Sequence, residues 1–382
     1  MKLRVAIVTE SFLPALNGVT NSVLRVLETL RQEGHEAIVI APGSNVDTYL
    51  GFRVITIGSV PFMQFSVAVP SPRLSGILRE FAPDVIHVAS PVFLGKQAIA
   101  WASRNFVPSV AVFQTDLAGY VERYGLATIR PAVDAFIASI HQPATVNLAP
   151  TEDGAKYLRS LGAPRVAVWG RGVDLELYHP NRKSSEAAIA NRGAWAPNGE
   201  RIVGFVGRLA PEKQVSRMKE LFHLENTRFV IVGDGPERTK LETEFAGQPV
   251  HFAGKLTGEE LANAYAAFDV FVHFGTEETF GQTIQEAQST GLPVVAPSSG
   301  GPKFLINSGV DGFLVNVDAD NDFASPVARL LDDVSLRAVI GEGARRAVLA
   351  KSWSENNAKL LVHYKRAIQI ELESKLARVQ YA

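Results

Sequence analysis

The feature that most constrains this chain is a repeated alternation of short β-branched segments with longer amphipathic ones. Residues 4–8 form an apolar segment of strand length, and residues 19–33 carry apolar side chains at helical spacing on one face. Similar strand segments follow, with helical stretches between most of them, at residues 37–40, 54–57, 85–88, 110–113, 146–148 and 166–168. Continuous apolar strands separated by helices predict a parallel sheet that helices cover on both faces.

The alternation stops at residues 169–197, which contain Gly170, Gly172, Pro180 and a polar run over 181–186, and then it resumes. The second series of strand segments comprises residues 202–206, 229–232, 250–252, 270–273, 293–296 and 313–315. This interruption predicts an α/β chain with two doubly wound, Rossmann-like domains, residues 1–168 and 169–353. A long helix is expected from about residue 354 to residue 376, and its periodicity does not show which domain it packs against.

Composition excludes several classes of protein. The 382 residues are 46% hydrophobic and 20% charged, which is typical of a folded globular chain and not of a disordered one. The absence of cysteine excludes disulfides, thiol nucleophiles and thiolate metal sites. The 38 basic and 39 acidic residues argue against a nucleic-acid partner. The eight histidines show no metal-binding spacing, so no metal is expected.

The sequence also indicates where the protein works. The apolar segment at residues 2–9 is too short for a signal-peptide core, and no apolar stretch is long enough to span a bilayer. We therefore expect a cytoplasmic protein. Residues 61–70, followed by Arg73 and Arg79, are interpreted as an apolar loop that either touches a membrane surface or is buried, with burial favoured.

In doubly wound sheets, ligands bind in the loops at the carboxyl ends of the strands. The first such loop ends in Asn17 and Gly18, where a glycine lets backbone N–H groups approach an anion; a plain turn is the favoured interpretation of this motif alone. The sequence lacks G-x-G-x-x-G, and its second strand ends without the acid that binds ribose, which argues against NAD.

The second domain offers two cations at its first strand end. Arg208 and Lys213 follow Gly207 and suit a diphosphate, although a solvated surface pair fits equally well. The turn at Gly233 and Gly235 permits a close backbone approach or caps a helix.

Two carboxylates mark the loop after residues 270–273. Glu278 lies before a helix expected from about Phe280, and Glu286 lies eight residues later in its second turn. At about 1.5 Å rise per residue they cannot easily flank one glycosidic bond, as a hydrolase pair does. They could hold two separate polyols, while a favourable interaction with the helix dipole explains Glu278 and, less well, Glu286.

In the first domain, polar residues follow the strand segment 110–113. Gln114, Asp116 and Tyr120 are expected to face the ligand site, and capping of the next segment is an equally good interpretation of Asp116. His87 ends another strand, where a lone histidine is more often structural than catalytic.

In chain order, these motifs resemble the retaining GT-B glycosyltransferases of family four. The resemblance rests most specifically on Glu278 and Glu286 with Phe280 and Gly281 between them. Residues 83–91, 114–116 and 169–174 further resemble GDP-mannose-dependent α-mannosyltransferases that act on envelope glycolipids of the lipomannan type. Sulfoquinovosyl-diacylglycerol synthases, which use a UDP-sugar, look similar over the same stretches.

The resemblance implies a role for each motif. Arg208 and Lys213 neutralise the donor diphosphate, on which the Gly18 loop closes from the other domain. Glu278 binds the transferred sugar with the backbone N–H groups of Phe280, Gly281 and Gln282. Thr283 approaches the phosphates, Glu286 holds the ribose, and Lys255 and Leu256 flank the base. The acceptor side contains Asn17, Gln114, Asp116 and Tyr120. The C-terminal helix, about residues 354–382, completes the first domain.

One position departs from the family pattern. Many relatives have a histidine where this chain has Gln114, and a glutamine cannot act as a proton-transfer base. The leaving phosphate is therefore expected to accept the acceptor proton. The resemblance also implies transfer of mannose without a metal, because two cations and a helix N-terminus take its place. The expected acceptor is a glycolipid at the inner face of the plasma membrane. A UDP-sugar-dependent lipid glycosyltransferase is the alternative, and a non-catalytic sugar-binding protein a distant one.

Overall fold

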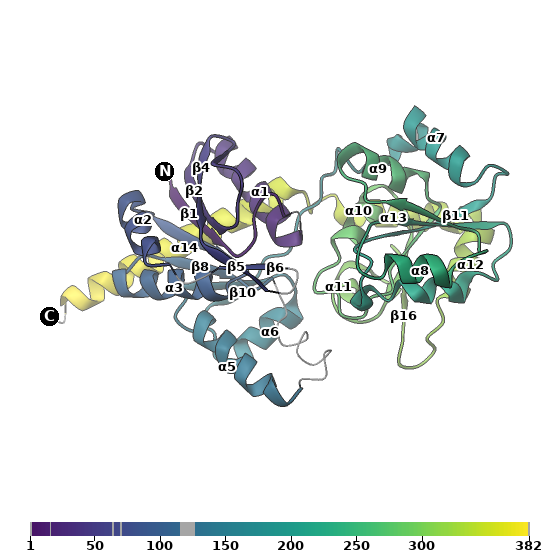
Figure 1. The fold of residues 1–382 in the computed structure, drawn as a ribbon. Helices are drawn as coiled ribbons and strands as arrows, with labels where there is room; N and C mark the ends of the chain where they lie inside the picture. The colour runs from purple at the N-terminus through teal and green to yellow at the C-terminus, as the bar shows by residue number, and fades with distance from the viewer. Residues whose placement is uncertain (1, 16, 63–64, 69–70, 115–126, 381–382) are drawn as a thin grey trace. The chain divides into compact units, whose positions relative to one another are not determined.

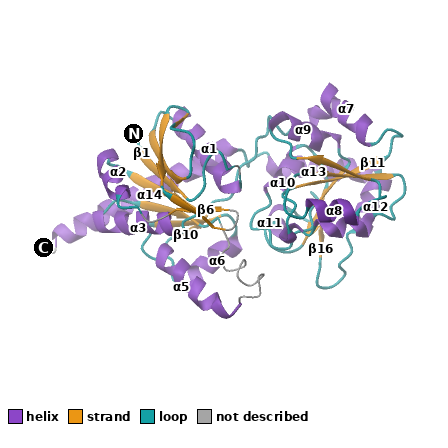
Figure 2. Cartoon of the chain, in the orientation of Figure 1, coloured by secondary structure: helices purple, strands orange, loops and turns teal. Residues whose placement is uncertain are grey.

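The computed structural model describes residues 2–15, 17–62, 65–68, 71–114 and 127–380 (Figure 1). The chain divides into two compact units, unit 1 made of Met1–Arg171 with Trp353–Ala382 and unit 2 of Gly172–Ser352. In each unit, helices lie on both sides of a parallel sheet (Figure 2). The prediction of two doubly wound α/β units is confirmed.

Unit 1 contains an eight-stranded sheet in the order β10-β9-β8-β7-β1-β2-β4-β3, parallel except that β3 pairs antiparallel with β4. Its strands are β1 (Arg4–Thr9), β2 (Glu36–Pro42), β3 (Thr48–Tyr49), β4 (Phe52–Ile57), β7 (Val85–Ala89), β8 (Ser109–Val112), β9 (Val146–Ala149) and β10 (Val166–Val168). Its helices are α1 (Gly18–Gln32), α2 (Arg73–Phe81), α3 (Phe93–Asn105), the 3-10 turn η1 (Ala127–Ile129), α5 (Arg130–His141), α6 (Glu152–Ser160) and α14 (Trp353–Gln380).

Both faces of this sheet are buried. On one face Val5 and Ile7 of β1 pack with α1 and α14, and on the other Ala6 and Val8 pack with α2 and α3. Because alternate side chains enter two different cores, the strand is apolar at successive positions.

The C-terminal helix α14 packs in unit 1. Its Tyr364 is fully buried, and the hydroxyl lies 2.8 Å from Nδ1 of His87 in β7. Trp169, expected to begin the second domain, is 2% exposed, and its indole N–H donates to the carbonyl oxygen of Asn356 at 3.0 Å. These contacts explain why unit 1 extends to Arg171 and not only to residue 168.

The described residues 59–62 and 65–68 differ from the expected apolar loop. They form an antiparallel pair of strands, β5 (Ser59–Phe62) and β6 (Phe65–Ala68), in which Val60 lies opposite Val67. Valine and phenylalanine favour extended structure, which agrees with these two strands.

Unit 2 contains a parallel six-stranded sheet in the order β13-β12-β11-β14-β15-β16. Its strands are β11 (Arg201–Val206), β12 (Thr227–Val232), β13 (Val250–Gly254), β14 (Val270–Val272), β15 (Val294–Pro297) and β16 (Phe313–Val315). Its helices are α7 (Glu186–Trp195), α8 (Arg238–Glu244), α9 (Gly258–Ala267), α10 (Gln282–Ser289), α11 (Pro302–Leu305), α12 (Ala324–Asp332) and α13 (Val334–Val348), with the 3-10 turns η2 (Pro180–Ser184), η3 (Pro211–Lys213) and η4 (Val215–Leu221).

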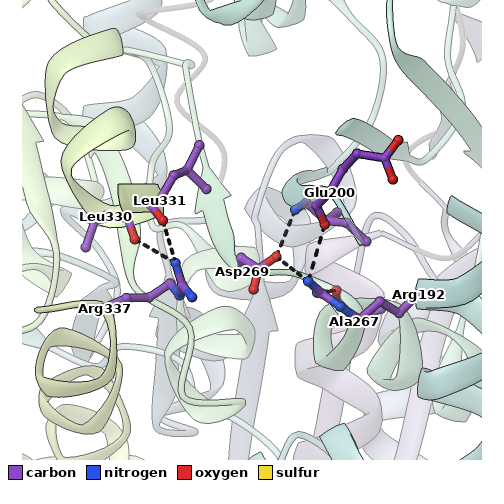
Figure 3. Close-up of polar contacts among 8 residues, drawn as sticks. Arg192, Glu200, Ala267, Asp269, Leu330, Leu331 and Arg337 are labelled. Carbon is purple, nitrogen blue, oxygen red and sulfur yellow. Dashed lines mark hydrogen bonds and ion pairs between the residues drawn. The ribbon is translucent and has the colours of Figure 1, made fainter. Parts of the chain in front are cut away.

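A polar cluster joins elements of unit 2 at the amino ends of its strands (Figure 3). Oδ2 of Asp269, just before β14, accepts from the backbone N–H of Ile202 at 2.8 Å and from Arg192 of α7 at 2.9 Å. Arg337 of α13 donates to the carbonyl oxygens of Leu330 and Leu331 at the end of α12, both at 3.0 Å. The described polar groups at this edge therefore hold structural elements together.

The buried histidines of unit 1 predict a loss of stability in mild acid. Burial lowers the pKa of His87 to about 3 and that of His141 to about 4, from 6.5 in an unfolded chain. Below pH 6.5 the unfolded chain therefore binds more protons than the folded one, so the free energy of unfolding falls, by up to about 1.4 kcal/mol per pH unit for each histidine. Denaturant unfolding between pH 7 and pH 5 measures this slope.

His87→Gln, which keeps a hydrogen-bonding group for Tyr364, should make the slope shallower by one proton. The comparison between pH 8 and pH 9, where these imidazoles are almost entirely neutral in both states, is the control. If the wild type and His87→Gln have identical slopes between pH 7 and pH 5, the buried His87 does not contribute to the pH dependence of the free energy of unfolding.

Candidate active site

The residues singled out in unit 2 lie at the carboxyl ends of neighbouring strands. The order of the sheet places β11 between β12 and β14, so the connection from β11 to β12 and the connection from β14 to β15 run in opposite directions across the sheet. A doubly wound sheet binds its ligand at such a reversal. Arg208 follows β11, and the loop that carries Glu278 follows β14, so both flank this point.

Both predicted cations contact carboxylates. The ammonium of Lys213, at the end of η3, lies 2.5 Å from Oε2 of Glu278, and the two side chains are only 21% and 16% exposed. Nη2 of Arg208 lies 2.9 Å from Oε1 of Glu212. The structure thus joins Lys213 to Glu278 directly, a contact that nothing in the sequence indicated.

The environment of Glu278 keeps it ionised. Burial would raise its pKa, but the charge of Lys213, together with His273 and the backbone N–H of Phe280, outweighs burial and lowers the pKa to about 2. That N–H donates to Oε1 at 3.3 Å. An ionised carboxylate only accepts hydrogen bonds, so Glu278 suits sugar hydroxyls and does not supply a proton.

Two glycine turns closely approach the backbone of these loops. A Cβ at Gly233 would lie 1.9 Å from the carbonyl oxygen of Gly207, and a Cβ at Gly301 would lie 2.2 Å from that of Phe280. The backbone N–H of Gly301 donates to the carbonyl oxygen of Glu278 at 2.5 Å. Of the two interpretations of the Gly233 turn, the structure supports the close approach, which positions the Arg208 loop.

Helix α10 begins at Gln282, two residues later than expected. Its cap is Gly281, with φ of +100°, and this residue has no side chain to bond the N–H groups of the first turn. Those groups, with the positive end of the helix dipole, suit a phosphate or a sugar oxygen. Thr283 lies in the same turn.

Glu286 lies in the second turn of α10 and is 9% exposed. The hydroxyl of Tyr265, from α9, lies 2.9 Å from its Oε2 and 3.2 Å from the carbonyl oxygen of Thr283. Burial, with the charge of Glu286, raises the pKa of Tyr265 well above its ordinary value, so the phenol remains a donor. The sequence did not indicate this contact of Tyr265 with a predicted site residue, since its apolar neighbours in α9 indicate only a core position.

The loop after β13 reaches the same edge. The carbonyl oxygen of Gly254 accepts from the backbone N–H of Gly233 at 2.8 Å, which places Lys255 and Leu256 beside the glycine turn. Lys255 is exposed, and Leu256 packs partly against the core.

In unit 1, Asn17 caps α1, accepting from the backbone N–H groups of Val19 and Thr20 at 2.9 and 3.0 Å. This favours the plain helix-start interpretation of Asn17 and Gly18. A Cβ at Gly18 would lie 2.4 Å from Nη1 of Arg171, so that guanidinium occupies the space beside the glycine.

Gln114 is 8% exposed and donates to Oγ of Ser22 at 3.3 Å. Together with Phe113, His141 and others it lines a small cavity. Asp116 and Tyr120 lie outside the described residues.

Comparisons with known proteins identify the family. The model for "Glycosyltransferase Family 4" matches residues 16–177, and that for "Glycosyl transferases group 1" matches residues 190–347. A GDP-mannose-dependent alpha-mannosyltransferase of Mycolicibacterium smegmatis is 44% identical over 96% of this chain and 98% of its own. The chain belongs to glycosyltransferase family 4.

A more distant relative and a solved structure were also similar to this chain. The sulfoquinovosyl transferase SQD2 of Arabidopsis thaliana is 33% identical over 90% of this chain and 70% of its own. A solved structure of Anabaena Alr3699/HepE with UDP superimposes with a TM-score of 0.78 over 96% of this chain and 100% of that one, at 19% identity. The protein is therefore an enzyme, a glycosyltransferase of the GT-B fold, as the resemblance implied.

The described residues show neither a metal-binding cluster nor a membrane-spanning helix. They hold no group of three or more histidine, cysteine, aspartate and glutamate side chains placed to bind a metal ion. Within the same ranges, no helix is both long enough and apolar enough to cross a bilayer.

The close approach of Gly301 predicts that a methyl group there disrupts the site. Gly301→Ala leaves an ordinary backbone, since φ is −61°, but its Cβ displaces the Phe280 carbonyl and with it the Glu278 loop. Overpacking of this kind costs about 1–3 kcal/mol, and we expect glycosyl transfer to fall at least ~10-fold.

The matched control is Gly193→Ala in α7, where a Cβ meets nothing within 4 Å. Alanine favours a helix by about 1 kcal/mol over glycine, so this variant should be fully active and at least as stable. Equal activity of the two variants would contradict the assigned role of Gly301.

Proposed function

We propose that this enzyme transfers α-mannose, with retention of configuration, from GDP-mannose to a membrane glycolipid of the glucuronosyl-diacylglycerol or phosphatidylinositol-mannoside type. The observation that carries the proposal is the group formed by Arg208, Lys213 and Glu278 at one edge of the unit 2 sheet. Its support is the 42–44% identity, over nearly the whole chain, to GDP-mannose-dependent alpha-mannosyltransferases.

In this proposal unit 2 binds the donor. Arg208 and Lys213 face the diphosphate, Glu278 accepts hydroxyls of the mannose, and Glu286, oriented by Tyr265, accepts those of the ribose. The remaining donor contacts are the first turn of α10 with Phe280, Gly281, Gln282 and Thr283, and the base-flanking Lys255 and Leu256.

The reaction breaks the bond between the anomeric carbon and the donor phosphate oxygen. The acceptor hydroxyl oxygen forms the new bond, and its proton passes to the phosphate of the departing GDP. Arg208 and Lys213 stabilise the charge that develops on that phosphate, an electrostatic contribution of the kind that is often the largest in an enzyme. Gln114 positions groups by hydrogen bonds and takes no proton. A covalent mannosyl adduct on Glu278 or Asp116 would contradict this sequence of events.

Unit 1 receives the acceptor in this proposal, through Gln114, Asp116, Tyr120 and the Asn17 turn. Because a lipid acceptor lies in a membrane, we place the enzyme in the cytoplasm, peripheral to the inner face. The second candidate is a UDP-sugar-dependent lipid glycosyltransferase, which the 33% identity to a sulfoquinovosyl transferase favours.

Nucleotide preference tests the donor. GDP at about 100 times its dissociation constant should add about 2.7 kcal/mol to the free energy of unfolding, seen as a higher midpoint in a thermal scan. UDP, ADP and NAD, measured in parallel, should add much less. Stabilisation by UDP and not by GDP would support the second candidate, and stabilisation by NAD alone would overturn both.

Arg208→Ala tests the chemistry. Loss of the guanidinium should reduce mannosyl transfer from GDP-mannose to lipid acceptor by about 100-fold or more, because the leaving diphosphate loses a positive charge. Its control is Arg346→Ala, which removes a partner from another i,i+4 ion pair, Arg346–Glu342 at 3.0 Å, on the exposed side of α13. Unchanged transfer by Arg208→Ala would refute the proposed site, and transfer by the wild type excludes a non-catalytic sugar-binding protein.

A further inference from the structure

His273, just after β14, is a buried histidine that the proposed reaction does not use. It is 1% exposed, and neither ring nitrogen has a hydrogen-bond partner among the described residues. His87 and His141 are equally buried, but His87 lies 2.8 Å from the Tyr364 hydroxyl and His141 lies 2.7 Å from Oδ1 of Asn147. A buried polar group without a partner destabilises the fold, so its presence requires an explanation.

The imidazole lies beside the Lys213–Glu278 ion pair. Burial lowers its pKa to about 4, with Glu278 and Lys213 acting in opposite directions, so the ring is neutral at pH 7. A Cβ at Gly275 would lie 3.3 Å from Nε2 of His273 and 3.5 Å from Cα of Lys213, so the ring and the start of the lysine side chain adjoin the same glycine. The nearby backbone of Gly275 raises the pKa of the ring slightly against the effect of burial. Neither ring nitrogen meets the distance and angle of a hydrogen bond to it.

We propose that His273 is a positioning residue whose imidazole N–H binds the Glu278 carboxylate once the donor diphosphate draws the Lys213 ammonium toward itself. This inference rests on the proposed function. A diphosphate carries more negative charge than one carboxylate, so the ammonium turns toward it when the donor binds. Glu278 then loses its main donor at the moment when it must accept hydroxyls of the sugar.

A neutral histidine suits this replacement for a physical reason. Its N–H supplies a hydrogen bond without placing a second positive charge beside Lys213. In the ligand-free protein the same group is unsatisfied, and an apolar ring of similar size would pack at least as well. The histidine therefore costs stability in the free enzyme and contributes in the donor complex, a trade-off known at functional sites.

The experiment compares His273→Phe and His273→Gln with the wild type. The phenylalanine variant should have a thermal midpoint equal to or higher than the wild type, bind GDP with an affinity within about 2-fold, and lose at least ~10-fold in kcat/KM for GDP-mannose. The glutamine variant, whose amide keeps an N–H, should recover most of that loss.

His87→Phe is the matched control, since it removes an equally buried imidazole that has a partner. It should lower the midpoint and leave kcat/KM of the folded enzyme unchanged. A His273→Phe variant with wild-type kcat/KM would overturn the inference, and so would one that loses stability and GDP affinity together, because both results indicate a structural role.

Failure of the proposed function gives a different result. In that case the wild type transfers nothing from GDP-mannose, and the same comparison is made with UDP-glucose and UDP as probes. With these probes, a His273→Phe variant that loses stability and UDP affinity together would overturn the inference, and so would one with wild-type kcat/KM.

Discussion

The arrangement of the site depends on the ion pair between Lys213 and Glu278. It joins the loop after β11 to the loop after β14, the two connections that leave the sheet where its strand order reverses. Removing two charges from water is costly, and such a pair is favourable only when further hydrogen bonds satisfy its groups. The backbone N–H of Phe280 supplies one to Glu278, and Gln214 bonds Oγ1 of Thr276 at 3.0 Å across the same two loops.

Both loops are also restrained from behind. Gly233 and Gly301 allow neighbouring turns to approach within distances that no side chain would permit, so the loops have little room to shift. At the other end of the sheet, Asp269 binds the start of β11 and Arg192 of α7, which fixes the strands from which the loops emerge. Unit 2 therefore holds the backbone of the loops proposed to bind the donor in place before any donor binds, and such preorganisation reduces the ordering required for reaction.

The sequence was sufficient to predict the strands and the two doubly wound units, because burial on both faces leaves continuous apolar runs that periodicity records. It also indicated Arg208, Lys213, Glu278 and Glu286, since loops after parallel strands meet at one edge. Contacts between segments that are far apart in the sequence produce no periodic pattern from which they could be predicted. Tyr265 and His273 lie in apolar stretches typical of core, and their proposed roles follow from which charged groups the fold places beside them.

The end of unit 1 was also difficult to predict, because it depends on contacts with a segment that is distant in the sequence. Trp169 follows the last strand of unit 1 and precedes a glycine-rich segment, so local sequence suggests the start of a linker. Its burial against α14, from almost two hundred residues away, assigns it to unit 1. The antiparallel strands β5 and β6 contain residues with strong strand propensity, but an apolar run flanked by prolines is equally typical of a loop.

The paired charges change the meaning of the balanced composition. Arg208 and Lys213 contribute two positive charges at the proposed diphosphate site, and Glu212 and Glu278 contribute two negative ones, so these four side chains sum to zero. A bare phosphate must compete with carboxylates for each cation. A nucleotide sugar competes more effectively, because its hydroxyls satisfy Glu278 while its phosphates take Lys213. The uncapped start of α10 adds a positive potential that neither carboxylate cancels. Neutrality at this site therefore favours a ligand that carries phosphate and sugar together over one that carries phosphate alone.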